Sequence, residues 1–477
     1  MHDQKKKEKE VLSPEQKAAA AAEHERVGVL YKAVLHTSKA HDYSMKTLDC
    51  TESLLMAVPE AYTAYNCRRC ALEAVWKQTE FCEAASTAKG EKEEDAATRQ
   101  EWLRKELKLN SKVLLMNYKN YNAFVHRHWV FDQIEALAKA ELMAMQRKRE
   151  STSTTSDTDA APSPTDSPKA PTFALLQQLL QKERAQCEQL LQMDERNFHA
   201  WNYRRWVLAQ ERRANALART YLPPPSCHTA GAESGALDAD DDAAVAAEGQ
   251  SVAFTTDEAE ELAYTTHKIK NNFSNYSAWH QRSLVLKSAA ARWQAHLAST
   301  EETPSTEETR AACHRALLTQ LREDVGFLEQ AIYCDPNDQS AWFYAPFVLQ
   351  LLHSDRQTAG EAAEAAALKD VFVNAVIELI AEVELLGTED ECYIPYYFLL
   401  DQFINLQSAP EEDSKAAAAR YTDALFQKVP SLTAVANSTE NRQRRCFCFL
   451  HQRLCKADVL RKGLYDELLK KATQSIG

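Results

Sequence analysis

Glycine is scarce in this sequence, with only 10 glycines among 477 residues. An all-β chain of this length would need many glycine-rich turns and β-branched runs. Alanine, leucine, glutamate, glutamine and arginine are abundant instead, and these residues favour helices. Because 45% of the residues are hydrophobic, the chain can bury a sizeable core. We therefore predict an all-α fold.

The sequence also lacks a net positive charge and long hydrophobic runs. The formal net charge is −13, which argues against a general nucleic-acid surface, since such a surface needs a basic domain or stripe. No apolar stretch approaches the roughly 20 residues that span a bilayer. The first residues, MHDQKKKEKE, are charged and lack the apolar segment of a secretory signal. We expect a cytoplasmic protein without a membrane span or a nucleic-acid partner.

Cysteines arranged as a metal site are absent from the sequence. The chain has 12 cysteines, but Cys67 and Cys70 form a Cys-x-x-Cys pair without a second pair at matching distance. A structural zinc site needs four ligands. The pattern is typical of reduced thiols within helices, and we assign no metal to this chain.

Four polar segments interrupt the helical pattern. Their compositions cannot bury enough apolar surface to offset chain ordering, and such insertions normally lie in loops between helices. We predict a flexible N-terminus at 1–20 and one helical repeat domain at 21–475, with flexible insertions at 86–99, 150–172, 214–256 and 298–309.

A short motif recurs five times between these segments. The stretch NFHAWNYRRWVL at 197–208 shows it most fully, and the other copies lie at 61–72, 120–131, 275–286 and 338–349. Each copy has a small residue before an aromatic residue, and the first four have arginine three positions later. The aromatic and arginine positions are Tyr65, Arg68, Phe124, Arg127, Trp201, Arg204, Trp279, Arg282 and Trp342.

The spacing within the motif predicts helices that pack in a stack. An aromatic residue at i, arginine at i+3 and an aliphatic residue at i+7 share one helix face. A single helix pair cannot bury such a face, so neighbouring pairs must cover it, as in an α-α solenoid. The stretches 175–194 and 321–335 supply partner helices, and 371–386 is a further amphipathic helix. We expect the motif aromatics to fill gaps between helices and the arginines to pair with carboxylates of adjacent helices.

The repeated pattern Asn-aromatic-x-Ala-Trp-x-x-Arg resembles the repeat of the protein prenyltransferase α subunits. Within that family, DERNFHAWNYRR (194–205), NFSNYSAWH (272–280) and DPNDQSAWFY (335–344) are most similar to the Rab geranylgeranyltransferase type. The last motif departs from the pattern, with Ala345, Pro346 and Phe347 in place of His-Arg-Trp. The immunoglobulin-like insert and leucine-rich repeats of mammalian relatives are not found in this sequence.

The resemblance implies a right-handed crescent of helix pairs that wraps a β subunit. That partner would hold the zinc ion and the isoprenoid cavity, where a zinc thiolate of the protein substrate attacks C1 of geranylgeranyl diphosphate. The other partners implied are a Rab escort protein and a Rab GTPase substrate. Most catalytic residues would therefore belong to another chain.

The resemblance assigns one catalytic role to this chain. The stretch YKNYNAF (118–124) matches the segment from which these enzymes present a lysine to the diphosphate, so the role passes to Lys119. An ammonium held at the leaving oxygens would favour the transition state. From the sequence alone, a solvated surface lysine is the alternative.

The resemblance also suggests substrate-contacting residues in the second and third repeats. These are Tyr121, Asn122, Asn197, Phe198 and His199. Asn122 stands where the CaaX-type enzymes carry a glutamine that helps to read the substrate carboxylate, and this difference favours the Rab type. His2 is a candidate autoinhibitory ligand of the partner's zinc, and an unstructured terminal histidine is the alternative.

The sequence predicts an α subunit of a Rab-type geranylgeranyltransferase heterodimer, which provides a scaffold, part of the diphosphate site and an escort-docking face. Two alternatives remain open. One is the α subunit shared by farnesyltransferase and geranylgeranyltransferase type I. The other is a non-enzymatic helical-repeat adaptor that kept the fold and lost the partner.

Overall fold

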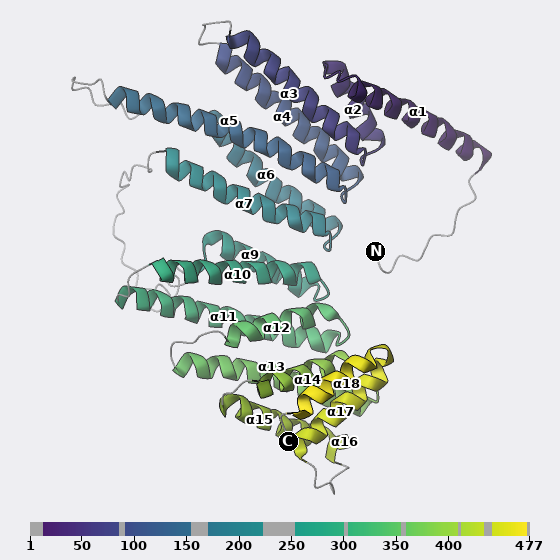
Figure 1. Cartoon of the computed structure of the whole chain (residues 1–477), viewed down its shortest axis with the longest axis vertical. Coiled ribbons are helices and arrows are strands. Elements are labelled where there is room, and N and C mark those ends of the chain that lie inside the picture. The colour runs from purple at the N-terminus through teal and green to yellow at the C-terminus, as the bar shows by residue number, and fades with distance from the viewer. Residues whose placement is uncertain are drawn as a thin grey trace, which may run out of the picture. The chain divides into compact units, whose positions relative to one another are not determined.

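All regular elements in the described part of the chain are helices (Figure 1). The computed structural model describes residues 13–84, 91–153, 170–222, 253–299, 304–353, 359–408, 412–433 and 441–474. The predicted all-α class is confirmed. No helix among these residues has an apolar stretch long enough to cross a membrane.

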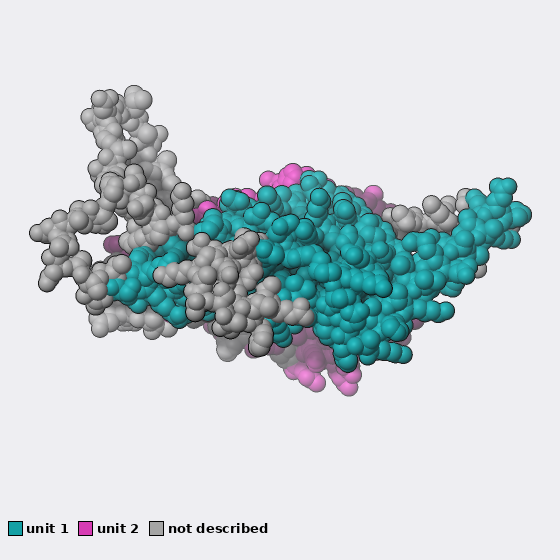
Figure 2. All heavy atoms as spheres, turned by 90° about the horizontal axis from the view of Figure 1, so that it is seen from above, with its two compact units in different colours: residues 1–232 teal, residues 233–477 magenta. Residues whose placement is uncertain are grey.

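The chain divides into two compact units, 1–232 and 233–477 (Figure 2). The helices of the first unit are α1 (Pro14–Lys39), α2 (Met45–Ala57), α3 (Tyr62–Ala84), α4 (Glu91–Met116), α5 (Tyr121–Ser153), α6 (Pro171–Met193) and α7 (Phe198–Tyr221). Those of the second are α9 (Thr256–Asn271), α10 (Tyr276–Ser299), α11 (Pro304–Cys334), α12 (Gln339–His353), α13 (Ala359–Leu386), α14 (Ile394–Ser408), α15 (Glu412–Lys428), α16 (Pro430–Thr433), α17 (Arg442–Ala457), the 3-10 turn η1 (Val459–Arg461) and α18 (Lys462–Gln474).

In the last four of the five repeats, consecutive helices pair through the same short turn. An Asn or Asp follows the first helix of the pair, and its side-chain oxygen accepts a hydrogen bond from the backbone N–H two residues later. This Asx turn ends the helix and reverses the chain. The four acceptors are Asn117, Asp194, Asn272 and Asp335, with bonds of 3.2, 3.1, 2.9 and 3.0 Å.

An asparagine then starts the second helix and ties it to the repeat before. The side-chain oxygen of Asn197 accepts hydrogen bonds from the backbone N–H groups of His199 and Ala200, which caps α7. Its amide nitrogen donates to the carbonyl oxygen of Tyr118 at 2.9 Å. Asn120 makes the equivalent bond to Pro59. One side chain therefore both caps a helix and sets the position of the neighbouring turn.

The motif aromatics fill the space behind these turns. Trp201 and Trp279 are each 1% exposed, and their indole N–H groups donate to the carbonyl oxygens of Glu195 and Phe273, six residues earlier, at 2.8 Å. Tyr65 and Trp342 donate in the same way to residues six positions earlier. Burial of the ring is thus combined with a satisfied polar atom.

Three of the four motif arginines, Arg68, Arg127 and Arg282, pair with buried carboxylates of the next helix pair. Arg68 binds Glu106 through two nitrogens at 3.0 and 2.5 Å. The equivalent pairs are Arg127 with Glu183 and Arg282 with Asp324, each at 2.6 Å. The nitrogen Nη1 of each arginine also donates to a backbone carbonyl 20 residues earlier, on Leu48, Leu107 and Leu262.

Each of these carboxylates also accepts a bond from the motif of its own repeat. His126 Nε2 lies 3.0 Å from Glu106, Tyr203 donates to Glu183 at 2.8 Å, and Tyr344 donates to Asp324 at 2.6 Å. Consecutive repeats therefore share one buried acid. Burial alone would raise the pKa of Glu106, but the bonds from His126 and Arg68 hold it at about 2.

The predicted helices are present, and several are longer than predicted. The helix expected at 371–386 begins at Ala359, and its stripe of Val373, Val376, Ile377, Ile380 and Val383 is buried. Alanine-rich sequence before the apolar stripe explains the extension, because alanine has the highest helix propensity.

Helices also extend into the predicted flexible segments. α1 begins at Pro14, α4 at Glu91 and α11 at Pro304, while α7 continues to Tyr221. The limits of the predicted flexible segments were set by their polar composition. Charged and alanine-rich residues can nevertheless extend a helix whose other part is already packed against its neighbours. Residues 154–169, 223–252 and 300–303 of the predicted segments lie outside the described residues.

A histidine in α5 makes the stability of the first unit depend on pH. His128 stacks on Trp206, with ring centroids 4.2 Å apart, and burial lowers its pKa to about 4. The unfolded chain binds the proton near pH 6.5, so protonation favours unfolding. We expect the thermal midpoint to fall as the pH is lowered from about 6.5 to about 4.

The variant His128→Phe keeps an aromatic ring on Trp206 and removes the proton-binding site. The fall in midpoint should be smaller than in the wild type, although part of it should remain because burial also lowers the pKa of His126. An identical fall in His128→Phe would show that His128 is not the titrating group.

Candidate functional site

Lys119 lies in the turn between α4 and α5, with its ammonium directed at the following repeat. Its backbone N–H donates to the Asn117 side chain at 3.2 Å, which fixes the turn. Its Nζ lies 2.6 Å from Oδ2 of Asp194, the residue that ends α6. The Lys119 side chain is 34% exposed, so an anion in solution can reach the ammonium.

Asp194 is the residue at this site that sequence reasoning missed. One of its oxygens accepts the Asx-turn bond from the Arg196 N–H, and the other binds Lys119. Burial would raise its pKa, but the bonds from Lys119 and Arg196 lower it. The sequence did hold a signal, because the same turn position is neutral in Asn117 and Asn272 but charged in Asp194 and Asp335.

Aromatic side chains surround this ion pair at the beginnings of α5 and α7. Tyr121 and Phe198 are 65% and 60% exposed. His199 lies between them, with ring centroids 6.0 Å from Tyr121 and 4.0 Å from Phe198. It also stacks on Phe124 at 6.2 Å. The two exposed rings stand on the same edge of the unit as Lys119.

The two asparagines predicted to contact substrate, Asn122 and Asn197, make hydrogen bonds to the neighbouring turns. Asn197 is 1% exposed and binds the carbonyl of Tyr118, the residue before Lys119. Asn122 donates from its side chain to the carbonyl of Glu60 at 3.3 Å. The six predicted site residues of the second and third repeats therefore meet at one edge, formed where α5 and α7 begin. His2 lies outside the described residues.

The motif arginines and aromatics do not take part in this edge. Phe124, Arg127, Trp201 and Arg204 are at most 6% exposed and lie within the helix stack. The residues that carry the sequence resemblance are therefore structural, and the edge is built from their neighbours in the turns.

Lys119 is the cation of this edge, and the Asp194 carboxylate competes with any anion that binds it. Burial and the charge of Lys119 both lower the pKa of His199, so the imidazole is neutral near pH 7. An ammonium carries three N–H groups, and it can bind an oxyanion while Asp194 accepts one of them. Charge-assisted bonds of this kind are about twice as strong as neutral ones.

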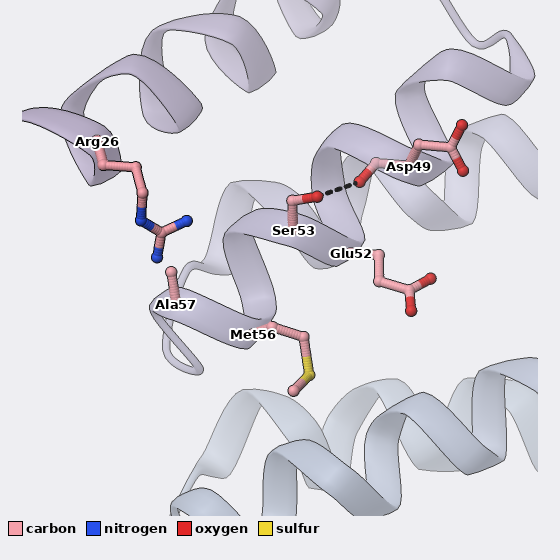
Figure 3. Close-up of a pocket in the computed structure, with 6 residues that line it drawn as sticks. All are labelled: Arg26, Asp49, Glu52, Ser53, Met56 and Ala57. Atoms are coloured by element: carbon pink, nitrogen blue, oxygen red, sulfur yellow. Dashed lines mark hydrogen bonds between the residues drawn. The ribbon is translucent and has the colours of Figure 1, made fainter. Parts of the chain in front are cut away.

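A separate surface hollow between α1 and α2 has a different character (Figure 3). Arg26 faces it from α1, while Asp49 and Glu52 of α2 point away from the arginine. The Arg26 guanidinium is already bonded to Glu23 at 2.6 Å. Two carboxylates with one paired guanidinium do not suit a diphosphate, and the edge at Lys119 remains the better anion site.

Comparison with protein families agrees with the helix-pair geometry. The profile described as the protein prenyltransferase alpha subunit repeat matches residues 103–134, 180–211, 258–289 and 321–352. Each match joins the end of one helix, the Asx turn and the next helix. The chain carries the repeats of the protein prenyltransferase α subunits. The first motif, 61–72, lies outside these matches, but α2 and α3 show the same contacts through Tyr65 and Arg68.

Curated relatives carry the same name in several organisms. The geranylgeranyl transferase type-2 subunit alpha of Bos taurus is 27% identical over 341 residues, which are 71% of this chain and 40% of that protein. The Saccharomyces cerevisiae protein of the same name is 25% identical over 253 residues, 53% of this chain and 56% of that protein. The chain thus aligns with less than two thirds of the length of these relatives.

A solved structure of a prenyltransferase is also similar. It is the Candida albicans protein geranylgeranyltransferase-I complexed with GGPP, with 17% sequence identity and a TM-score of 0.42. The alignment covers 94% of this chain and 91% of that one.

Proposed function

We propose that this chain is the α subunit of a Rab-type geranylgeranyltransferase, a heterodimer that transfers geranylgeranyl from geranylgeranyl diphosphate to C-terminal cysteines of Rab GTPases. The observation that carries the proposal is the edge at Lys119. There an accessible ammonium lies beside exposed aromatic side chains, within repeats that match the prenyltransferase α subunits. The names of the relatives support the type-2 enzyme.

The exposed aromatics supply a surface for a partner chain. The first residues of α3, α5 and α7 are Tyr62, Tyr121 and Phe198, and each is at least 59% exposed. Aromatic residues are enriched in protein interfaces, so these exposed rings suit contact with another protein. We assign this edge to a β subunit, which would hold the zinc ion and the isoprenoid cavity.

Lys119 would act on the leaving group. The diphosphate gains negative charge as its bond to C1 of the isoprenoid breaks, so an ammonium already held in place favours the transition state. Asn120 and Asn117 fix the turn that carries Lys119, and the neutral His199 adds no second charge. Tyr121 and Phe198 would line the mouth of the cavity.

Substrate choice would be delegated to an escort protein. Asn122 is committed to the carbonyl of Glu60, so its short side chain would not read a substrate carboxylate. An escort that holds a Rab tail near the site raises the local concentration of its cysteines. The proposed complex would work in the cytoplasm.

The proposal is tested with the purified heterodimer and labelled geranylgeranyl diphosphate. We expect transfer to a Rab protein that requires the escort protein and poor transfer to CaaX peptides. Efficient modification of CaaX peptides without escort would identify the shared α subunit of the other two enzymes. Failure of the chain to bind any prenyltransferase β subunit would identify a helical-repeat adaptor.

A further inference from the structure

Helices α17 and α18 of the second unit lie side by side (Figure 1), and three possible metal ligands converge between them. His451 and Cys455 lie one turn apart on α17, so they project from the same face. Asp466 reaches them from α18. His451 Nε2 lies 2.7 Å from Asp466 Oδ1 and 3.4 Å from Cys455 Sγ, and the three ligand atoms lie within 4.8 Å of one another.

The helix corner that carries these side chains is firmly packed. The adjacent face of α17 is fully buried and consists of Phe447, Leu450 and Leu454. Tyr465, next to Asp466 in the sequence, is buried and donates a hydrogen bond to Asp458 at 2.6 Å. The register of α18 against α17 is therefore fixed, and the three ligands are held near one another without a metal.

Both contacts of His451 use the same ring nitrogen. If Nε2 carries the proton, it donates to Asp466, and the thiol of Cys455 has only a weak contact with it. If Nε2 is unprotonated, it can accept from the thiol, but its lone pair then faces the Asp466 carboxylate. A single proton cannot serve all three groups, whereas a cation at their centre would bind all of them.

We propose that His451, Cys455 and Asp466 form a zinc-binding site that links α17 to α18. A nitrogen, a sulfur and an oxygen donor together suit Zn²⁺, whereas Mg²⁺ and Ca²⁺ prefer oxygen ligands alone. The sequence interpretation assigned no metal to the chain, because it looked for four ligands and found no second cysteine pair to match Cys67 and Cys70.

The two distances from His451 Nε2 can be compared with the geometry of a zinc site. Tetrahedral zinc with usual bond lengths separates sulfur from nitrogen by about 3.6 Å and nitrogen from oxygen by about 3.4 Å. The distance of 3.4 Å from Cys455 Sγ to His451 Nε2 is already close to the first value. The distance of 2.7 Å from Asp466 Oδ1 to His451 Nε2 must increase by about 0.7 Å to reach the second. The Asp466 side chain is 54% exposed, so it can rotate outward. Its open side also gives water access to the fourth position.

Cobalt is a suitable probe, since it replaces zinc and reports thiolate ligation by absorption. Titration of the full chain with Co²⁺ should produce thiolate-to-cobalt charge transfer and tetrahedral d–d bands, and Zn²⁺ should displace them. Cys455→Ser should abolish the charge-transfer band. His451→Ala and Asp466→Asn should each weaken Co²⁺ binding at least about tenfold. Loss of a residue that only supports a metal ligand already costs about that much in metal affinity.

Cys448→Ser is the matched control, because Cys448 lies on the same helix and is also partly buried. It should bind Co²⁺ like the wild type. Zn²⁺ should raise the thermal midpoint of the wild type and of Cys448→Ser but not of Cys455→Ser. If the chain is purified with a zinc-bearing partner, the difference between wild type and Cys455→Ser in the same complex isolates this site.

Absence of a cobalt–thiolate band in the wild type, or an unchanged band in Cys455→Ser, would overturn the proposal. The cluster would then be a hydrogen-bonded His–Asp pair beside an unrelated thiol. Neither readout depends on prenyl transfer, so this result is independent of the function proposed above.

Discussion

Replacing Arg282 with alanine should lower the free energy of unfolding by about 3–5 kcal/mol, the usual cost of removing one partner from a buried ion pair. Arg282 and Asp324 are both 0% exposed and lie 2.6 Å apart. The substitution leaves the Asp324 carboxylate in the protein interior with Tyr344 but without its cation. Urea denaturation followed by circular dichroism measures the loss.

The matched control for Arg282 is Arg322, which pairs with Glu364 at the same distance of 2.6 Å but is 62% exposed. Arg322→Ala should cost less than about 1 kcal/mol, because water screens exposed pairs. The double variant Arg282→Met with Asp324→Leu should recover part of the loss, since no buried charge remains. Equal effects of Arg282→Ala and Arg322→Ala would contradict the importance of burial.

Replacing Lys119 with alanine should slow geranylgeranyl transfer by about 2–3 kcal/mol of transition-state stabilisation, or roughly 30- to 160-fold. This prediction concerns the heterodimer under single-turnover conditions, where the transfer step itself is observed. The loss should appear in the rate and not in the assembly of the two subunits, because the exposed aromatics assigned to the subunit interface are unchanged.

Two further variants define the role of Lys119. Lys105→Ala removes an exposed lysine of α4 that pairs with Glu101, and it should leave the rate unchanged. Asp194→Asn keeps the turn acceptor found naturally in Asn117 and releases the ammonium from its carboxylate. It should therefore strengthen diphosphate binding. A single-turnover rate that is unchanged in Lys119→Ala would remove this lysine from the mechanism.

Much of the fold could be predicted because the motif combines helical spacing with repetition. An aromatic residue, an arginine and an aliphatic residue on one face need a covering neighbour, and recurrence of the motif requires a stack of helix pairs. The ends of helices were less predictable. Residues 304–309 and 359–370 are polar or alanine-rich, and their helical state depends on continuation from a packed segment downstream.

The sequence predicted that ion pairs join the repeats, but it did not predict which residues form them. The arginines were expected to bind carboxylates of adjacent helices, but the partner of Arg127 lies 56 residues later in the sequence. Polar segments of irregular length separate the repeats, so spacing does not identify the acid. The sharing of Glu106, Glu183 and Asp324 between consecutive repeats became evident only when the helices were placed side by side.

The candidate site shows the same limit. Lys119, Tyr121 and Phe198 could be singled out from the resemblance, and the turns bring them to one edge. The contact of Lys119 with Asp194 could not be derived from either motif alone, because it joins two repeats. It arises from the stacking of turns through Asn197 and the carbonyl of Tyr118.

The ion pairs between repeats all run in the same direction along the chain, and they stop at the last motif. Each linking arginine points toward the C-terminal neighbour, and the last motif has Ala345 where the earlier motifs have arginine. Ala345 is fully buried, so this position offers no guanidinium to another unit of the same kind. The chain of ion pairs that joins one repeat to the next therefore stops at this motif.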